Sequence, residues 1–367
     1  MTRPDRAESN RPVVFLDFSH LGRHVTGIER VTIELFEKVV FPGADVRPVR
    51  AKGTLGMVLA QQVWLPLKAL MHPGARFVFP GFPPSPLFAF ARERVIHYVH
   101  DAFLITRPQD LSGKARIYMA WPFKRAVTRL RYFLTNSEKT RAELLPFVAH
   151  DAAITLYRPK VQNVFGLDAA ARRHPRAPGS PIKIISMGTV EPRKNYKAAI
   201  AILDALRAAG AADAELHIVG RTGWGEDAAL LQSAPGVTLH GYLDATDVKA
   251  LIESADLYLC TSHDEGLGLP LLEVQFAGLP VVAPNARVFR EALGASGVFI
   301  DPADPEAASR TILDLLSWPS GRVEASHLAA DNLERWNAAA EEDLARVQAL
   351  LASPMDMSLT AVARESA

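Results

Sequence analysis

The sequence predicts an α/β protein with helices packed on parallel β-sheets, and three observations support this prediction. Short apolar runs rich in Val, Ile, Leu and Phe alternate with segments of helical periodicity along the chain. The 367 residues are enough for two domains of ordinary size. Residues 170–183 are rich in Pro, Arg and small side chains, which is typical of an inter-domain linker. We therefore expect two α/β domains.

The predicted helices and strands alternate in both halves of the chain. A helix is expected over residues 27–40, where Ile28, Val31 and Leu35 share one face. Another amphipathic helix is expected over residues 333–351. The predicted strands are 13–18, 76–79, 95–99, 132–135 and 153–156 in the first half, and 182–187, 214–220, 237–241, 256–260 and 280–283 in the second.

Composition and charge limit the class of protein. Hydrophobic residues make up 49% of the chain and charged residues 22%, which is typical of a soluble globular protein. The formal net charge of +1 provides no field that would attract nucleic acid, so no nucleic-acid partner is expected. The single cysteine, Cys260, cannot form an intrachain disulfide and fits a reducing compartment. Residues 1–12 lack an apolar signal-peptide core, so we expect a cytoplasmic protein.

The most informative segment is 263–283, HDEGLGLPLLEVQFAGLPVVA. Glu265 and Glu273 flank a turn that contains Gly266 and Gly268 and leads into an apolar helix. Glycine lets backbone N–H groups come close to a ligand, and a helix N-terminus carries a partial positive charge. This combination binds anions, most often phosphate. With a carboxylate on each side for hydroxyl groups, the segment indicates a site for a sugar nucleotide.

A second segment with a chemical signal is MGTVEPRKN, residues 187–195. Gly188 follows a predicted strand, and the adjacent Arg193 and Lys194 open a helix. An Arg side chain can bind phosphate oxygens through two parallel hydrogen bonds, and Lys adds a compact positive charge. We therefore expect this pair to hold a diphosphate. A solvated helix start with two surface bases is the alternative.

The first domain has one candidate of its own in VIHYVHDAFL, residues 95–104. His100 and Asp101 come where a predicted strand ends. An imidazole at this position could hydrogen-bond a sugar hydroxyl, with a carboxylate fixing its tautomer. A lone histidine is more often structural, so a purely structural His100 is the alternative.

Two of these motifs resemble a known family. EGLGLPLLE, together with GTVEPRKN, is similar to the signature of the retaining glycosyltransferases of family 4, whose usual form is EGFGLPxLE. Leu267 stands where a Phe is common, and Thr189 stands where some members place the phosphate-binding Arg. The resemblance covers nearly the whole chain and is strongest over 182–302. It implies the GT-B fold, an α/β architecture of two facing Rossmann-like domains with the active site in the cleft between them.

The resemblance also implies a role for each candidate residue. Glu265 and His100 would contact the donor sugar, and Glu273 would hold the ribose. Arg193 and Lys194 would stabilise the departing diphosphate, where negative charge grows during transfer. The full set expected at the donor site is Gly27, His100, Gly188, Arg193, Lys194, Arg221, Gly241, Tyr242, Glu265, Gly266, Leu267, Gly268, Leu269 and Glu273.

Some of these residues are expected at the site through the resemblance alone. Arg221, after a predicted strand, would touch the base or the phosphate, although a merely structural turn is an equal alternative. Gly241 and Tyr242 would lie at the entrance of the base pocket. Gly27 and Arg30 would face the phosphates and the acceptor, with a solvated helix face as the equal alternative for Arg30.

The resemblance also implies the domain boundaries. They are 1–175 for an acceptor-side domain, 176–332 for a domain that binds the nucleotide sugar, 333–352 for a helix that crosses back to the first domain, and 353–367 for a tail.

Residues 113–133 offer two interpretations. The segment contains six bases, no acids and interleaved aromatic residues, which suits an anionic membrane surface or a lipid pyrophosphate. A helix packed on the sheet with extended basic side chains is the alternative. A core-facing stripe that includes Trp121, Val127 and Leu130 slightly favours the second interpretation.

The predicted function is therefore retaining transfer of a sugar from a nucleotide diphosphate to a hydroxyl of a glycan or lipid-linked acceptor. A GDP-sugar, with mannose or a related hexose, is favoured over a UDP-sugar, because bacterial relatives with the GTxEPRKN pattern often use such donors for surface polysaccharide. No Asp-x-Asp motif accompanies the site, so neither an obligate metal nor a further cofactor is expected. The alternatives are a UDP-sugar 2-epimerase or hydrolase on the same scaffold, and a non-catalytic protein that binds sugar nucleotides.

Overall fold

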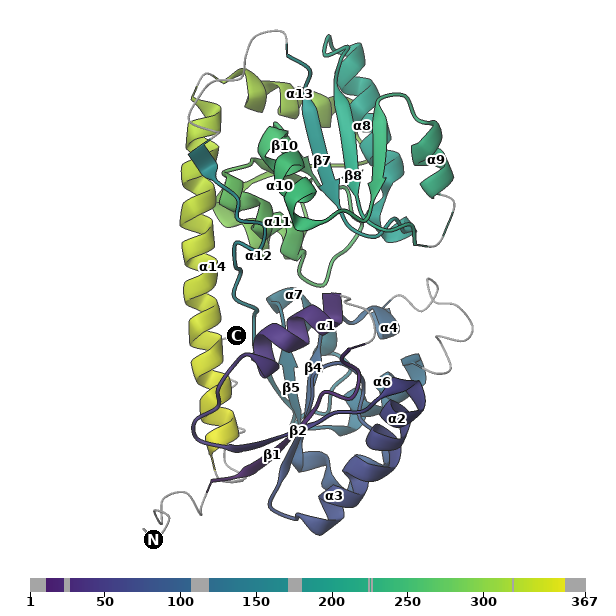
Figure 1. Ribbon diagram of the computed structural model, residues 1–367, viewed down its shortest axis with the longest axis vertical. Coiled ribbons are helices and arrows are strands. Elements are labelled where there is room, and N and C mark those ends of the chain that lie inside the picture. Colours follow the sequence, from purple (N-terminus) through teal and green to yellow (C-terminus); the bar gives the residue numbers. More distant parts are fainter. Residues whose placement is uncertain are drawn as a thin grey trace. The chain divides into compact units, whose positions relative to one another are not determined.

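The chain folds into two compact α/β units, each with a parallel six-stranded sheet (Figure 1). The computed structural model describes residues 11–22, 27–106, 119–170, 180–223, 225, 227–318 and 320–353. Unit 1 comprises residues 1–160 and 339–367, and unit 2 comprises residues 161–338. The α/β fold with two domains, as predicted from the sequence, is confirmed.

The sheet of unit 1 has the strand order β2-β1-β3-β4-β5-β6, and every pair is parallel. Alternate residues face opposite sides of each strand. Phe15, Phe77 and Phe79 therefore pack into one core cluster, whereas Val14 and Leu16 are buried on the other face. The strands are β1 (Val13–Asp17), β2 (Asp45–Val49), β3 (Arg76–Phe79), β4 (Val95–Val99), β5 (Tyr132–Thr135) and β6 (Ala153–Leu156).

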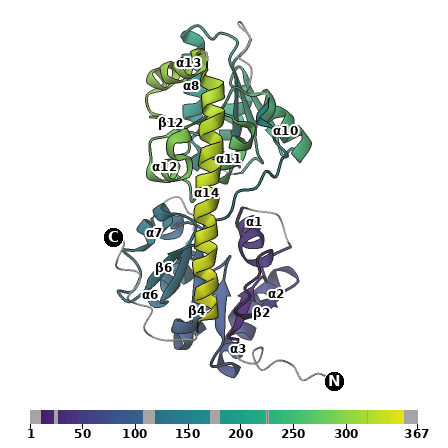
Figure 2. The same cartoon turned by 90° about the vertical axis from the view of Figure 1, so that its left-hand side faces the viewer.

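Helices cover both faces of this sheet. The cluster around Phe77 is covered by α3, η4 and α6, and the opposite face carries α1 and the end of α14 (Figures 1 and 2). The helical elements are α1 (Gly27–Thr32), the π-helical turn η2 (Ile33–Glu37), α2 (Gly53–Leu59), the π-helical turn η3 (Ala60–Trp64), α3 (Leu65–Met71), the 3-10 segment η4 (Pro86–Arg94), α4 (Phe103–Thr106), α6 (Trp121–Arg129) and α7 (Glu138–Leu144).

The sheet of unit 2 has the order β12-β11-β10-β7-β8-β9 and is also parallel throughout. The strands are β7 (Lys183–Met187), β8 (Glu215–Val219), β9 (Val237–Gly241), β10 (Leu257–Leu259), β11 (Val281–Pro284) and β12 (Gly297–Ile300). One core cluster lies under α8 and α13, and the other under α10, α11 and α12. The helical elements are η8 (Pro192–Lys194), α8 (Tyr196–Ala208), α9 (Asp227–Ser233), α10 (Ala245–Ser254), α11 (Leu269–Glu273), η9 (Val274–Ala277), α12 (Arg287–Leu293), η10 (Gly294–Ser296), α13 (Pro305–Ser317) and α14 (Gly321–Ala352).

The last helix is longer than the sequence predicted. α14 begins at Gly321 rather than near residue 333, and Figure 2 shows it as one unbroken helix. Its residues to 338 belong to unit 2, where Trp336 is fully buried, and its residues from 339 belong to unit 1. In unit 1 the fully buried Asp343 accepts a 2.6 Å hydrogen bond from Arg158. The early part of the helix escaped prediction because its few large apolar residues give only a weak periodicity.

The two units divide between Lys160 and Val161, whereas the sequence placed the boundary after residue 175. Val161 belongs to unit 2 because its backbone N–H and C=O both bind the side chain of Asn337 in α14, and its side chain joins the core of unit 2. The centre of the expected linker, 171–179, lies outside the described residues.

In both sheets the strand order reverses beside the first strand. The reversal lies between β1 and β3 in unit 1, and between β7 and β10 in unit 2. Ligands of open α/β sheets bind outside the carboxyl ends of the strands at such a reversal. The loops that follow these four strands are therefore the places to look for function. No helix in the described part of the chain is long and apolar enough to cross a bilayer.

Candidate functional site

At the reversal in unit 2, the loop after β7 and the loop after β10 are joined by hydrogen bonds. The backbone N–H of His263 donates to the carbonyl of Arg193 at 2.9 Å. The hydroxyl of Thr261 donates to the carbonyls of Lys194 and Asn195 at 3.1 and 3.0 Å. Asn195, with φ of 51°, turns the chain from η8 into α8. Two segments about 70 residues apart in sequence thus form one rigid edge.

Glu265 lies at the centre of this edge and is only 6% exposed. Its Oε1 accepts hydrogen bonds from Lys194 Nζ at 2.7 Å and from Ser262 Oγ at 2.8 Å. Its Oε2 accepts from Arg193 at 2.6 Å, and Arg193 also donates to Glu191 at 2.7 Å. The structure therefore brings together three of the four predicted catalytic residues, as an ion cluster rather than as separate groups.

The opposite charges of this cluster keep one another ionised by shifting their pKa values. Burial on its own would raise the pKa of Glu265, but the positive charges of Lys194 and Arg193 outweigh it and lower that pKa to about 2. Burial would likewise lower the pKa of Arg193, but Glu265 and Glu191 raise it overall. Glu265 and Arg193 are thus ionised at neutral pH. The two acids and the two bases make the cluster neutral as a whole, with both cations close to the sheet edge.

Gly188 creates the path along which Lys194 reaches Glu265. A Cβ on Gly188 would lie 2.7 Å from Cε and 2.8 Å from Nζ of Lys194, and its φ of 142° also favours glycine. At the end of the neighbouring β8, a Cβ on Gly220 would lie 1.9 Å from the Gly188 carbonyl oxygen. The glycine predicted at the strand end is therefore needed to place the Lys side chain and to let two backbones pass.

The Gly-rich turn of the 263–283 segment has a packed side and an open side. Gly268, with φ of 79°, opens α11, and a Cβ there would lie 2.8 Å from Leu271 Cδ1. Leu267 is buried in the core cluster, so it can offer a ligand its backbone but not its side chain. Gly266 and Leu269 are partly buried. The apolar helix expected after the turn is α11, which has five residues and continues as η9.

Glu273, the second carboxylate of the motif, is the last residue of α11. It is 2% exposed, much like Glu265. Both carboxylates of the motif are therefore buried in unit 2.

Arg221, Gly241 and Tyr242 lie together at the carboxyl ends of β8 and β9. The guanidinium of Arg221 lies 5.0 Å above the ring of Tyr242, and both side chains are exposed. Gly241 ends β9 with φ of 70°. The backbone carbonyl of Arg221 accepts from Val190, which ties this pair to the loop that carries Arg193. A flat ring stacked on a cation is the kind of surface that binds a nucleotide base.

In unit 1, His100 lies where β4 ends. Its Nε2 donates to the carbonyl of Pro80 at 2.7 Å, and its own carbonyl accepts from Asn136. Burial lowers the pKa of His100 to about 4, so the ring is neutral at pH 7 and carries its proton on Nε2. Its Nδ1 is then a hydrogen-bond acceptor. The Pro80 carbonyl, rather than a carboxylate, binds the ring, and Asp101 accepts from the N–H of Phe103 at 3.1 Å.

Sequence reasoning missed a polar cluster at the reversal in unit 1. Asp17, the last residue of β1, is 1% exposed and accepts from Gln61 Nε2 at 2.8 Å and from the N–H of Ser19 at 3.0 Å. The buried ring of His20 lies against Gly81, where a Cβ would come within 2.5 Å of it. The signal was present in VVFLDFSH, because an acid and a histidine directly follow an apolar strand.

The remaining predicted positions are exposed or only partly described. Gly27 is exposed and opens α1, and Arg30 pairs with Glu34 at 3.1 Å on the same helix. Of the basic segment 113–133, residues 113–118 lie outside the described residues. Within the described ranges, no group of three or more His, Cys, Asp or Glu side chains is arranged to hold a metal ion.

Comparison with known proteins shows what unit 2 is similar to. Residues 168–335 match the family model described as "Glycosyl transferases group 1". A curated relative, O-antigen chain mannosyltransferase B of Escherichia coli, is 27% identical over 249 residues. This match covers 63% of our chain and 63% of the relative, so the chain spans less than two thirds of that protein.

Solved structures extend the likeness to the whole fold. The crystal structure of WaaG, a glycosyltransferase involved in lipopolysaccharide biosynthesis, is 16% identical with a TM-score of 0.62, covering 92% of our chain and 99% of that chain. Sucrose-phosphate synthase from Thermosynechococcus elongatus is 16% identical with a TM-score of 0.67, covering 93% and 100%. The chain therefore has a GT-B fold, and its residues 168–335 match the glycosyl transferases group 1 family model.

Proposed function

We propose that the protein is a retaining glycosyltransferase of family 4 that transfers mannose or a related hexose from a GDP-sugar to a hydroxyl of a glycan or lipid-linked acceptor in surface polysaccharide synthesis. The observation that carries the proposal is the cluster of Lys194, Arg193 and Glu265 at the strand reversal of unit 2. The relative that is a mannosyltransferase supports the choice of sugar. A cytoplasmic location stays a prediction from the sequence.

The cluster suits a diphosphate leaving group. When the bond between the sugar and the diphosphate breaks, negative charge grows on the phosphate oxygens, and fixed cations lower the energy of that state. Lys194 and Arg193 are held within hydrogen-bond distance of one carboxylate, so their positions are set before the donor arrives. Because these cations can balance the charge of the phosphates, the reaction needs no obligate metal ion.

Donor binding then changes the partners inside the cluster. In the free protein Glu265 neutralises both cations, and a diphosphate with its own negative charges competes for them. In the free protein these cations hold the pKa of Glu265 at about 2, so the carboxylate is ionised when the donor arrives. A carboxylate released from Lys194 and still bound to Ser262 can accept hydrogen bonds from sugar hydroxyls. The neutral His100 offers Nδ1 as another acceptor for a sugar hydroxyl.

The nucleotide part of the proposal is tested by a thermal-shift panel of GDP, UDP and ADP with their sugars, with and without EDTA. A ligand that binds only the folded state raises the unfolding temperature, by about 2.7 kcal/mol of stability at 100 times its Kd. We expect GDP and GDP-mannose to give the largest shifts, with no effect of EDTA. A shift with UDP compounds alone would show the choice of base to be wrong, and no shift with any nucleotide would overturn the proposal.

Catalysis is tested separately by product analysis with the preferred donor. NMR of the product should show the anomeric configuration of the donor. Conversion of a UDP-sugar to its 2-epimer or its hydrolysis product, with no need for an acceptor, would instead indicate the epimerase or hydrolase alternative. Tight nucleotide binding without any turnover would indicate a binding protein.

A further inference from the structure

The helix that follows β2 in unit 1 has an unusual outer surface. α2, η3 and α3 run end to end from Gly53 to Met71 along one side of the unit (Figure 1). An ordinary surface helix places its charged side chains outward. Here the large apolar side chains that are 42–74% exposed are Leu55, Val58, Leu59, Val63, Trp64, Leu67, Leu70 and Met71.

The inner side of the same helix already packs on the core of unit 1. Leu65 and Ala69 are buried in the core cluster of unit 1, and Gln61 reaches inward to hydrogen-bond Asp17. The orientation of the helix is thus fixed by its buried side. The outer apolar residues are surplus to the core of unit 1, and burying them against a partner would be favourable.

Two neighbouring elements extend this surface. The segment η4 and the helix α6 pack into the same core cluster as α3, so they cover the same face of the sheet. We call the outer surface of residues 53–71, 86–94 and 119–129 the apolar layer. Outside the helix already described, it exposes Leu87, Phe90, Met119 and Trp121. The layer thus holds twelve of the 21 large apolar side chains that are exposed among the described residues.

Bases outnumber acids in the apolar layer, which holds six Lys and Arg and one acid, Glu93, that is paired with Arg92 and Arg131. Residues 46–92 contain six Lys and Arg but no Asp or Glu. Lys52 is exposed, Lys68 lies 5.0 Å over the ring of Trp64, and neither has a carboxylate partner within the described ranges. Arg47 and Arg50, by contrast, are paired with acids and add little net charge.

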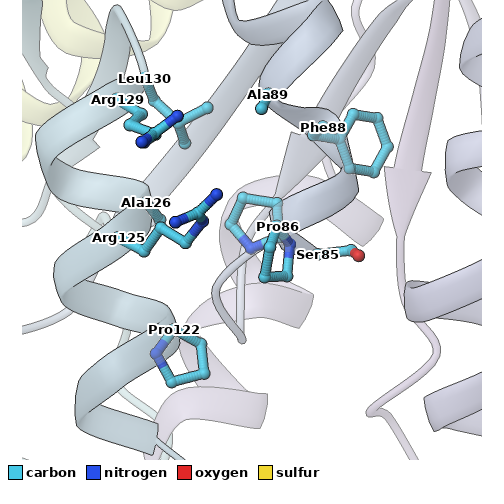
Figure 3. Close-up of a pocket in the computed structure, with 10 residues that line it drawn as sticks. Ser85, Pro86, Phe88, Ala89, Pro122, Arg125, Ala126, Arg129 and Leu130 are labelled. Carbon is cyan, nitrogen blue, oxygen red and sulfur yellow. The ribbon is translucent and has the colours of Figure 1, made fainter.

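A shallow pocket between η4 and α6 adds two more bases. Figure 3 shows Arg125 near Pro86, with Arg129 one helical turn away on α6. The Nε of Arg125 is buried without a hydrogen-bond partner among the described residues, and Arg129 is exposed. Two adjacent guanidinium groups in a pocket between apolar residues are suited to a phosphate group at the edge of an apolar surface.

We propose that the apolar layer docks onto the surface of an anionic lipid bilayer. Apolar side chains enter the boundary between headgroups and acyl chains, and Lys or Arg at the same level bind the negative headgroups. Nucleic acid would not require the apolar side chains. A second copy of the chain would bring bases against bases, which opposes self-association. A groove of about 540 Å³ beside Gly56, Leu59 and Val63 leaves room for part of a lipid.

This inference goes beyond the proposed function and does not depend on it. The nucleotide site lies in unit 2, whereas every residue of the apolar layer lies in unit 1. No residue belongs to both sites, so substitutions in the layer should leave nucleotide binding unchanged. Failure of one proposal can therefore be told apart from failure of the other.

The test is co-sedimentation of the full chain with vesicles of phosphatidylcholine, either pure or mixed with phosphatidylglycerol. We expect binding to the mixed vesicles and much weaker binding to the pure ones. The variant Leu55→Gln/Val63→Gln/Leu70→Gln should bind mixed vesicles roughly tenfold less. The variant Lys52→Glu/Arg129→Glu should lose roughly fivefold or more for each reversed charge.

Matched variants outside the layer serve as controls. Val40→Gln/Leu145→Gln changes equally exposed apolar residues of unit 1, and Lys38→Glu/Arg310→Glu changes exposed bases, so both should bind like the wild type. Circular dichroism and nucleotide thermal shifts check the fold of each variant. If the apolar variant fails to fold, the charge variant still decides the question.

Three results would overturn the proposal. The first is wild-type protein that stays in the supernatant with both kinds of vesicle. The second is a folded apolar variant and a folded charge variant that both sediment like the wild type. The third is a wild-type dimer in light scattering that the apolar variant converts to a monomer, without vesicle binding, because the layer would then be an interface between two copies.

Discussion

The carboxyl edges of the two sheets both contain a reversal of strand order, but their side chains differ in ionisation. In unit 2 the strand reversal carries Glu265 between Lys194 and Arg193, and the pKa of the carboxylate is lowered to about 2. In unit 1 the reversal is bordered by His100, which is neutral because burial lowers its pKa to about 4. A parallel sheet edge thus carries an ionised cluster around Glu265 in one unit and a neutral imidazole at His100 in the other.

The outer surfaces of the two units differ in how many large apolar side chains they expose. Among the described residues, sixteen large apolar side chains are exposed in unit 1 and five in unit 2. Unit 2 concentrates its unusual features at the sheet edge, where a charged nucleotide would bind. Unit 1 has its unusual feature on the helices that cover one face. Under the two proposals, unit 2 would hold the anionic donor and unit 1 would meet the apolar environment.

The largest effect is expected for Lys194→Ala, which removes one of the two cations of the unit 2 cluster. If Lys194 stabilises the departing diphosphate, its loss should lower kcat/KM by about 100- to 1000-fold, like removal of one oxyanion-binding donor. The measurement is the initial rate of sugar transfer with the preferred donor. Lys197→Ala, an exposed base on α8, is the control and should keep near wild-type activity. Full activity of Lys194→Ala would remove the cluster from the mechanism.

Glu265→Gln tests whether ionisation of the cluster stabilises unit 2. The folded state holds the pKa of Glu265 at about 2, against about 4.3 for an unperturbed Glu, so the ionised form stabilises the fold above that value. This contribution is lost as the pH falls from about 5 toward 2, and it amounts to about 3 kcal/mol at most.

Urea denaturation at a series of pH values from 7 down to 3.5 checks this prediction. The wild type should lose stability steeply on acidification, while Glu265→Gln should be less stable at pH 7 and change less with pH. Parallel curves for the two proteins would show that Glu265 is not the group that links stability to pH.

Gly188→Ala should have an intermediate effect on stability. Backbone strain and a collision with Lys194 both contribute to it, and a variant at a second glycine separates these two causes. Both Gly188 and Gly210 have positive φ, so alanine is strained at either position. Only at Gly188 does the new Cβ also collide with Lys194, because nothing lies within 4 Å of a Cβ on Gly210. We expect a loss of about 1 kcal/mol in Gly210→Ala and about 1–2 kcal/mol more in Gly188→Ala.

Denaturation midpoints of the two variants give this difference directly, and nucleotide thermal shifts show whether the displaced lysine weakens binding. Equal losses of stability in the two variants, with equal nucleotide binding, would contradict the role of Gly188 as the path for Lys194.

Much of the fold could be predicted from the sequence because the inner strands are continuous apolar runs between glycines and helices. The strands that were missed, β2 and β12, both lie at sheet edges. β2 contains Pro48 and two charged residues and is mostly exposed, so it lacks the apolar run of a buried strand. β12 is only four residues long and begins with glycine. Edge strands take their stability from one neighbour, and that neighbour is not visible in the local sequence.

The candidate site was predicted less completely than the fold. The residue types of the GTVEPRKN and EGLGLP motifs indicated phosphate and sugar chemistry, but the pairing of Lys194 with Glu265 joins residues 71 positions apart. The outward direction of Leu55 and Leu70 could not be read either, because LAQQVWLPLKALM is apolar on more than one helical face. Periodicity identifies such a helix but does not say which apolar side meets the core.

The smallest effect is expected at His100, where the neutral site of unit 1 should not titrate near physiological pH. An unperturbed histidine gains its proton near pH 6.5. Burial, together with the nearby His97 and His20, lowers the pKa of His100 to about 4, although the hydrogen bond from Nε2 to the Pro80 carbonyl acts in the opposite direction. Because the folded state prefers the neutral ring, stability that depends on it is complete above pH 6.5 and is lost as the pH falls through 4.

NMR titration of the imidazole signals, assigned with His100→Gln, should show no protonation of His100 between pH 8 and about 5.5. A midpoint near 6.5 for His100 would mean that its ring is charged at mildly acidic pH. The contrast between an ionised site in unit 2 and a neutral imidazole in unit 1 would then be wrong.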